Sequence, residues 1–188
     1  MDGHFGVNKF MLIKRSRLVI VLALVFAATV ASWGQASSPT AVVRAFYNFD
    51  RTTHSFLVDQ REIESRRKWM SAELYRALLK ELDRQREFLA KNPTDKPYFG
   101  DGLPVRPLDE ACEFNGREHF RKIYFGRTTI KGDLANVDVY FKYPRFCNIP
   151  DVLYAVNMSK ENGRWVIDDI RDIANNGSLL EDLNRKEY

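Results

Sequence analysis

The stretch that decides the fold is Glu161-Asn162-Gly163-Arg164-Trp165-Val166-Ile167-Asp168-Asp169-Ile170. Asn162 and Gly163 stand between two alternating apolar runs, and an Asn-Gly pair readily takes the positive φ angles of a tight hairpin turn. A second segment, Asn175 to Leu183, leads from the last strand into a short helix. The sequence therefore predicts a closing antiparallel hairpin followed by a short C-terminal helix.

The same period-two alternation extends back to Phe120. A turn at Lys131-Gly132-Asp133 separates the first two strands, and a third strand begins near Val152. In the second strand, one face carries Val137, Val139, Phe141 and Tyr143, and the other carries Asn136, Asp138, Tyr140 and Lys142. Because successive side chains point to opposite faces, this pattern predicts an antiparallel sheet of about four strands with one buried face.

Helical patterns precede the strands. Ser38 and Pro39 are typical of a helix start, and Ser71 can cap the second piece of a helical region from Asp59 to Lys91. Residues 92–118, rich in Pro and Gly, read as a long ordered loop or short edge strands. Helices first and antiparallel strands afterwards predict an α+β fold.

Four segments of the chain resemble a known protein family. They are Pro39 to Tyr47, Ser71 with Leu74 and Leu78, Lys96 to Pro104, and Trp165 to Ile170. In order and spacing they resemble the nuclear-transport-factor-2-like (cystatin-like cone) superfamily, and within it the bacterial family known as domain of unknown function 3828. The resemblance implies helices packed on a strongly curved, cone-like sheet whose inside binds a ligand. It also implies a small periplasmic protein of unassigned role.

The first 36 residues have the layout of a secretory signal peptide. Positive charges precede an apolar run from Leu18 to Val30, which is shorter than the about 20 residues that span a bilayer. Small residues follow at Gly34 and Ala36, so we expect cleavage after Ala36 and a single domain at 37–188. No Cys lies near this point, so no lipobox is predicted. An uncleaved anchor is the alternative, and either Met1 or Met11 can be the start.

The basic charge of the chain belongs mostly to that segment. The chain has 29 basic and 25 acidic residues, and residues 1–36 hold four of the basic and one of the acidic ones. The mature chain therefore keeps 25 basic and 24 acidic residues, a net charge of +1. This balance argues against nucleic-acid binding, which requires a concentrated basic footprint. The densest cluster, Arg66-Arg67-Lys68, has acidic neighbours and is predicted to be a solvated helix face.

The two cysteines are Cys112 and Cys147. In an exported protein an even pair predicts a disulfide, with two free thiols as the alternative. No His stands at zinc-ligand spacing from them, so we expect no metal site. The sequence also has no Gly-rich phosphate loop, HExxH or GxSxG, and we expect no cofactor.

Two residues are candidates for catalysis. Asp169 is two and four residues from Ile167 and Trp165, so alternation predicts that the three share a strand face. Cone-fold enzymes that the chain resembles, such as ketosteroid isomerase and scytalone dehydratase, use Asp, His and Tyr in the cone. The simpler interpretation is that Asp169 is a structural clasp that hydrogen-bonds backbone. His119 would need a buried position near Asp169 or a tyrosine.

Tyr140, Trp165 and Asp169 are the candidate ligand-binding residues. Tyr140 lies on the mixed polar face, whereas most other strand aromatics are expected in the core. We expect an exported, non-catalytic binding module for a small ligand or a periplasmic protein. An immunity-like protein that neutralises a toxin is one form of this hypothesis. A homodimer is also possible. The alternative is a small acid–base enzyme, an isomerase or dehydratase, that uses Asp169 with a Tyr or His.

Overall fold

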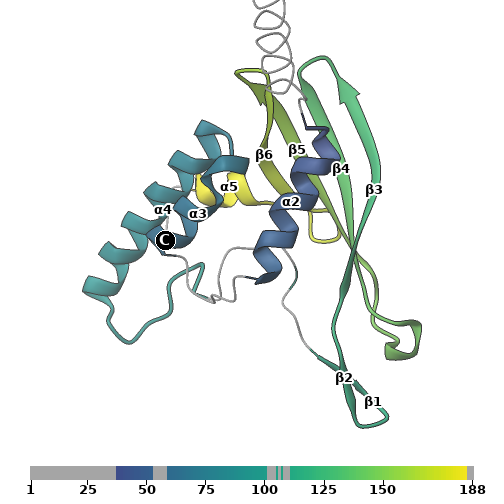
Figure 1. Cartoon of the computed structure of the whole chain (residues 1–188). Coiled ribbons are helices and arrows are strands. Elements are labelled where there is room, and N and C mark those ends of the chain that lie inside the picture. Colours follow the sequence, from purple (N-terminus) through teal and green to yellow (C-terminus); the bar gives the residue numbers. More distant parts are fainter. Residues whose placement is uncertain (1–36, 53–58, 101–104, 106, 108–110, 186–188) are drawn as a thin grey trace, which may run out of the picture. The chain divides into compact units, whose positions relative to one another are not determined.

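The computed structural model describes residues 37–185 except 53–58, 101–104, 106 and 108–110 (Figure 1). The predicted signal peptide, residues 1–36, lies outside the described residues. Ser37–Tyr188 forms one compact unit with helices and antiparallel sheets, an α+β fold. No described helix is both long enough and apolar enough to cross a membrane.

The helices begin where their capping residues predict. Helix α2 spans Pro39–Thr52, and the Ser38 Oγ accepts a hydrogen bond from the Ala41 N–H at 3.2 Å. The second helical region divides into α3 (Gln60–Arg66), a 3₁₀ turn η1 (Arg67–Trp69) and α4 (Ala72–Lys91). The Ser71 Oγ caps α4 by accepting from the Leu74 N–H at 3.1 Å, as predicted.

The strands form a five-stranded sheet and a separate two-stranded hairpin within the described residues. The sheet order follows the chain: β3 (Lys122–Lys131), β4 (Leu134–Lys142), β5 (Val152–Glu161), β6 (Arg164–Asp172) and β7 (Gly177–Ser178). The four long strands are those predicted, and the two-residue β7 adds a fifth. Asn162 and Gly163 have φ values of 52° and 76°, so the predicted tight turn between β5 and β6 is confirmed.

A β-bulge in β6 corrects the predicted face of Asp169. Met158 pairs with Ile167, but the preceding residue Asn157 pairs with Asp169, so Asp168 has no partner in the register. The extra residue reverses the alternation beyond it. Asp169 therefore lies on the sheet face opposite Ile167, and Ile170 takes the buried position instead, with 2% of its surface exposed.

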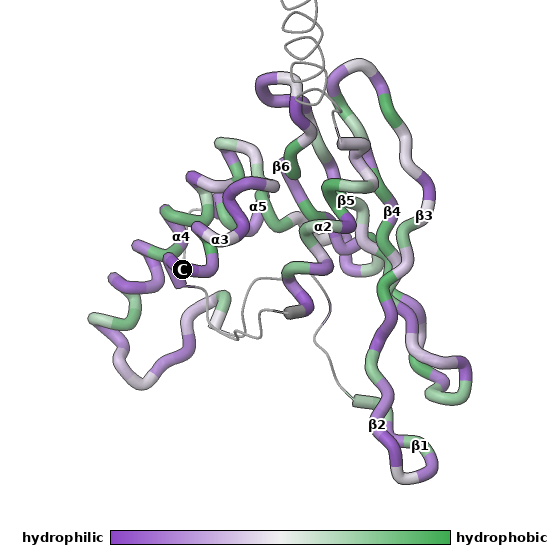
Figure 2. Tube along the Cα trace, viewed as in Figure 1, coloured by the Kyte–Doolittle hydropathy of each residue, from purple (hydrophilic) through white to green (hydrophobic). Residues whose placement is uncertain are grey.

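The hydrophobic core lies between the apolar sides of the helices and the sheet face that carries Ile167. Figure 2 shows apolar residues concentrated in β4 and β5 and alternating with polar residues along α4. Trp165 and Ile167 both belong to this core, as predicted. The ring of Tyr47 in α2 contacts that of Phe141 in β4, with centroids 5.6 Å apart in an edge arrangement. Further core members include Phe46, Leu74, Leu78, Val137, Val156 and Leu183.

The helices also cover the edge of β6. Met70 forms a parallel bridge with Ile167, and the Ser71 N–H donates to the Ile167 carbonyl at 2.9 Å. Unpaired strand edges invite association, so this contact satisfies groups that would otherwise face solvent. It also fixes the start of α4 beside the β5–β6 hairpin, which creates the pocket described below.

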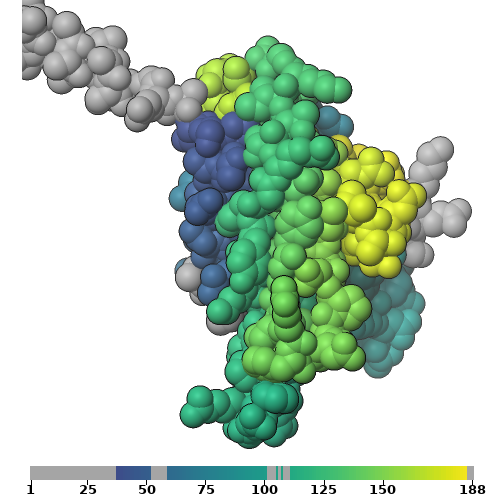
Figure 3. All heavy atoms as spheres, turned by 90° about the vertical axis from the view of Figure 1, so that its right-hand side faces the viewer, coloured from purple at the N-terminus to yellow at the C-terminus, as the bar shows by residue number. Residues whose placement is uncertain are grey.

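The hairpin of β1 (Cys112–Phe114) and β2 (Arg117–His119) precedes the large sheet. Figure 3 shows it at one end of the face that β3 to β5 present, with the C-terminal segment at the edge of that face. Cys112 is bonded to Cys147 in the 3₁₀ turn η2 (Arg145–Cys147), so the predicted disulfide is confirmed. The bond ties the hairpin to the connection between β4 and β5.

Candidate functional site

Asp169 holds the C-terminal helix in place. Its Oδ2 accepts from the Ser178 Oγ at 2.9 Å, and its Oδ1 accepts from the Leu180 N–H at 2.9 Å. Leu180 lies in the first turn of α5 (Leu179–Leu183). Both carboxylate oxygens thus bond to the segment that starts α5, which is the structural clasp considered in the sequence analysis.

The other predicted site residues lie apart from one another. Trp165 is 7% exposed in the core, whereas Tyr140 and Asp169 lie on the opposite face of the sheet. Tyr140 covers Gly126 of the neighbouring strand, where a Cβ atom would be 2.6 Å from the tyrosine ring. His119 packs edge-on against Phe146, with ring centroids 4.7 Å apart. The described residues thus contain no cluster that unites these candidates.

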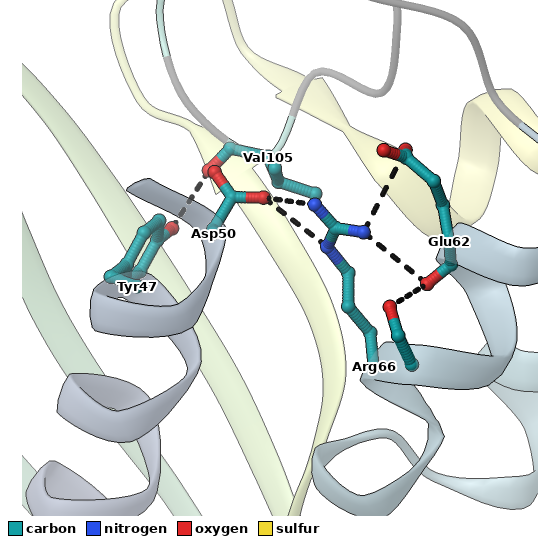
Figure 4. A network of polar contacts seen from close by, with 6 residues as sticks. Tyr47, Asp50, Glu62, Arg66 and Val105 are labelled. Carbon is teal, nitrogen blue, oxygen red and sulfur yellow. Dashed lines mark hydrogen bonds and ion pairs between the residues drawn. The ribbon is translucent and has the colours of Figure 1, made fainter. Parts of the chain in front are cut away.

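The basic cluster predicted to be a solvated helix face is divided in the structure. Arg66 is only 4% exposed, because its guanidinium bonds to the buried carboxylate of Asp50. Figure 4 shows the Arg66 guanidinium between Asp50 and Glu62. The Nη2–Oδ1 distance to Asp50 is 2.8 Å, and Nη1 donates to the Glu62 carbonyl at 3.2 Å. The prediction is therefore wrong for Arg66, which joins α2 to α3.

The hydroxyl of Tyr47 lies near this network and donates to the Val105 carbonyl at 2.8 Å (Figure 4). Burial raises the pKa of Tyr47 well above its ordinary value, and the charge of Asp50 raises it further. The phenol therefore stays protonated and continues to donate. Hydrogen bonds and ion pairs within the protein occupy this network, so we assign it to stability rather than to chemistry.

The other two members of the cluster, Arg67 and Lys68, are exposed and line a pocket. This helix–strand pocket, as we call it, lies between η1, the first turns of α4 and the β5–β6 hairpin, and its volume is about 570 Å³. Its lining residues are Arg67, Lys68, Met70, Ser71, Ala72, Tyr75, Arg76, Glu161, Asn162, Arg164 and Val166. A volume in this range suits a small ligand.

The apolar part of the pocket consists of buried residues. Met70 and Val166 are 5% and 6% exposed, and both line it. The ring of Tyr75 lies under the guanidinium of Arg67, with Cζ 4.7 Å from the ring centroid, and its hydroxyl donates to Glu64. These contacts fix an aromatic wall beside a charged rim.

Two carboxylates of β5 and β6, Glu161 and Asp168, accept hydrogen bonds from groups close by. The Ala72 N–H donates to Glu161 Oε1 at 3.0 Å, and the Ser159 Oγ donates to Asp168 Oδ1 at 3.0 Å. Burial raises the pKa of Asp168 above its ordinary value, hydrogen bonds from Ser159 and Ser71 oppose the rise, and the charges of Glu161 and Glu73 add to it. The described residues contain no group of His, Cys, Asp and Glu side chains suited to a metal ion.

No sequence pattern predicted this pocket, although the basic cluster Arg66-Arg67-Lys68 contains two of its lining residues. Its walls come from residues 67–76 and 161–166, which no local pattern connects. Comparisons of the chain with family models, with curated proteins and with solved structures find no match.

Proposed function

We propose that the chain is an exported, non-catalytic binding module whose small ligand occupies the helix–strand pocket. The pocket itself carries the proposal, because it combines an adequate volume with apolar, aromatic and charged lining residues. Its walls come from a capped helix and a tight hairpin, so regular structure positions the lining residues.

The proposal includes the cone-like fold of the superfamily that the sequence resembles and a location in the periplasm after loss of residues 1–36. The order of elements, helices followed by an antiparallel meander, supports the fold. The Cys112–Cys147 bond supports the location, because disulfides persist in oxidising compartments.

The acid–base enzyme has less support. Asp169 directs both carboxylate oxygens to Ser178 and Leu180, and His119 packs against Phe146 at another part of the fold. A general base has to reach the proton that it removes, and these two side chains share no described contact.

A protein partner is the second candidate, and one observation favours it. Phe114 and Phe146 stack with centroids 4.4 Å apart and remain 42% and 45% exposed. The disulfide beside them connects the hairpin to η2. Exposed aromatic pairs suit protein recognition, including that of an immunity-like protein.

Chemical-shift mapping of the exported protein tests the proposal. Three probes of one shape and different charge (benzoate, benzamide and benzylamine) are titrated separately. We expect at least one to shift the amide resonances of Ala72 and Val166, which line the pocket, and to leave those of Phe114 unchanged. If no probe shifts the pocket resonances, the small-ligand proposal is wrong and the protein-partner candidate takes its place.

A further inference from the structure

We infer that the ligand of the helix–strand pocket is a small organic anion, bound through a carboxylate or phosphate group. This inference rests on the function proposed above and adds the chemical class of the ligand. The excess of basic lining residues, the absence of carboxylate partners for them in the described part of the chain and the aromatic wall each support it.

The rim of the pocket is strongly cationic. Four of its lining residues are basic, Arg67, Lys68, Arg76 and Arg164, and one is acidic, Glu161. The mature chain as a whole is nearly neutral, with 25 basic and 24 acidic residues, so positive charge is concentrated here. Such a concentration raises the local concentration of anions and orients them toward the site.

None of these four cations forms an ion pair with a carboxylate within the described part of the chain. The contacts that they do make leave charge available. Arg76 Nε donates to the Ala72 carbonyl at 3.0 Å, and Lys68 Nζ lies 4.1 Å from the centroid of Trp69. A guanidinium has five N–H donors, so a single backbone bond leaves most of Arg76 free to bind an anionic group.

Two carboxylates near this rim form no ion pair with its four cations among the described residues. One oxygen of Glu161 accepts from the backbone N–H of Ala72 at the start of α4, and Asp168 accepts from Ser159 in β5. Their hydrogen-bond partners are therefore neutral groups. Arg164 on the hairpin and Arg76 on the helix stand on two walls of a pocket in which four basic lining residues outnumber the single acidic one, Glu161.

The aromatic wall indicates what the anion is attached to. Met70 and Val166 line the pocket but are only 5% and 6% exposed, so the partly exposed ring of Tyr75, beside Arg67, is the apolar surface that a ligand can cover. Inorganic ions gain nothing from such a surface, whereas an organic body gains by covering it. The volume of about 570 Å³ also exceeds what one inorganic ion needs.

The experiment compares benzoate and inorganic phosphate with benzamide and benzylamine by calorimetry and chemical-shift mapping on the exported protein, at constant ionic strength. We expect benzoate to bind at least about tenfold more tightly than benzamide, since hydrogen bonds to a charged acceptor are stronger than those to a neutral one. Benzylamine should bind more weakly than either. Phosphate binding without benzoate binding would identify phosphate as the group that is recognised.

Two variants test the residues. Arg164→Gln should weaken benzoate or phosphate binding about tenfold and leave benzamide binding unchanged, because Arg164 has no described packing role. Arg61→Gln is the matched control, since Arg61 is an exposed arginine outside the pocket, and it should bind like the parent.

The outcomes separate the inference from the function on which it rests. Benzamide or benzylamine binding in the pocket as tightly as benzoate overturns the anion inference and leaves the small-ligand function standing. Anion binding that Arg164→Gln and Arg61→Gln weaken equally reflects general charge and also overturns the inference. If no probe shifts the pocket resonances, both proposals are wrong.

Discussion

Asp168 and Asp169 are adjacent carboxylates at a β-bulge, where Asp168 is the extra residue, and they have different hydrogen-bond partners. Asp169 accepts two hydrogen bonds from the start of α5, at Ser178 and Leu180. Asp168 accepts from Ser159 and lies close to two other acids, Glu161 and Glu73, which raise its pKa after burial has done so. Asp169 therefore anchors α5 through its hydrogen bonds, whereas burial and two acidic neighbours disfavour the charged form of Asp168.

Asp169→Asn should lower the free energy of unfolding by about 1–2 kcal/mol, because an amide nitrogen cannot accept from the Leu180 N–H or the Ser178 hydroxyl. A thermal melt measures the change. Asp133→Asn is the control, since the Asp133 side chain is 79% exposed and pairs only loosely with Lys160. A melting temperature at or above that of the parent would favour the enzyme over the binding module, because catalytic carboxylates are often held at the expense of stability.

Asp168→Asn should make stability less dependent on pH. Burial raises the folded-state pKa of Asp168, so the native protein binds more protons than the unfolded chain. Stability therefore falls as pH rises from the ordinary pKa of 3.8 through the raised value, and the penalty persists at neutral pH. We expect the variant to melt higher than the parent at neutral pH and to match it near pH 3. Melts between about pH 3 and pH 7 measure this, and parallel curves for the two proteins would contradict it.

At the scale of the elements, the features that short sequence motifs specify were predictable. Ser71 caps α4 and the Asn162-Gly163 pair turns β5 into β6, because each depends on residues only a few positions apart. The bulge was not predictable in the same way. Asp168 and Asp169 fit an uninterrupted alternation equally well, and only the pairing of β6 with β5 shows which residue is extra.

The disulfide is the element-scale feature with the clearest energetic consequence. Its cysteines are 35 positions apart, and in the chain-entropy model closure of such a loop stabilises the fold by about 3–4 kcal/mol. We expect reduction to lower the free energy of unfolding by this amount, measured by denaturant unfolding with and without reductant. The double variant Cys112→Ser, Cys147→Ser is the control and should not respond to reductant. Two titratable thiols in the unreduced, unfolded protein would show that the bond is absent.

At the scale of the whole molecule, burial and pairing depend on residues that are distant in sequence. The acidic neighbours of Arg66 in the sequence predicted an exposed side chain. In the structure Arg66 is buried, because it bonds to Asp50 of another helix. Arg67 and Lys68 became pocket residues because the β5–β6 hairpin reaches the start of α4. Local charge patterns describe which side chains are polar, but the tertiary fold decides which of them share a cavity.

The proposed export connects residues 1–36, the disulfide and the proposed function, and it gives the last prediction. The full-length chain, produced in a bacterium with a periplasm, should be recovered from that compartment beginning at Ser37, because the apolar run from Leu18 to Val30 is followed by small residues. Intact-mass analysis should also show the loss of two hydrogens from Cys112 and Cys147. A variant with Leu22→Arg and Leu24→Arg should stay in the cytoplasm, uncleaved and with reduced thiols. A full-length product embedded in the membrane would instead show that residues 1–36 form an anchor, and would place the pocket on a tethered domain.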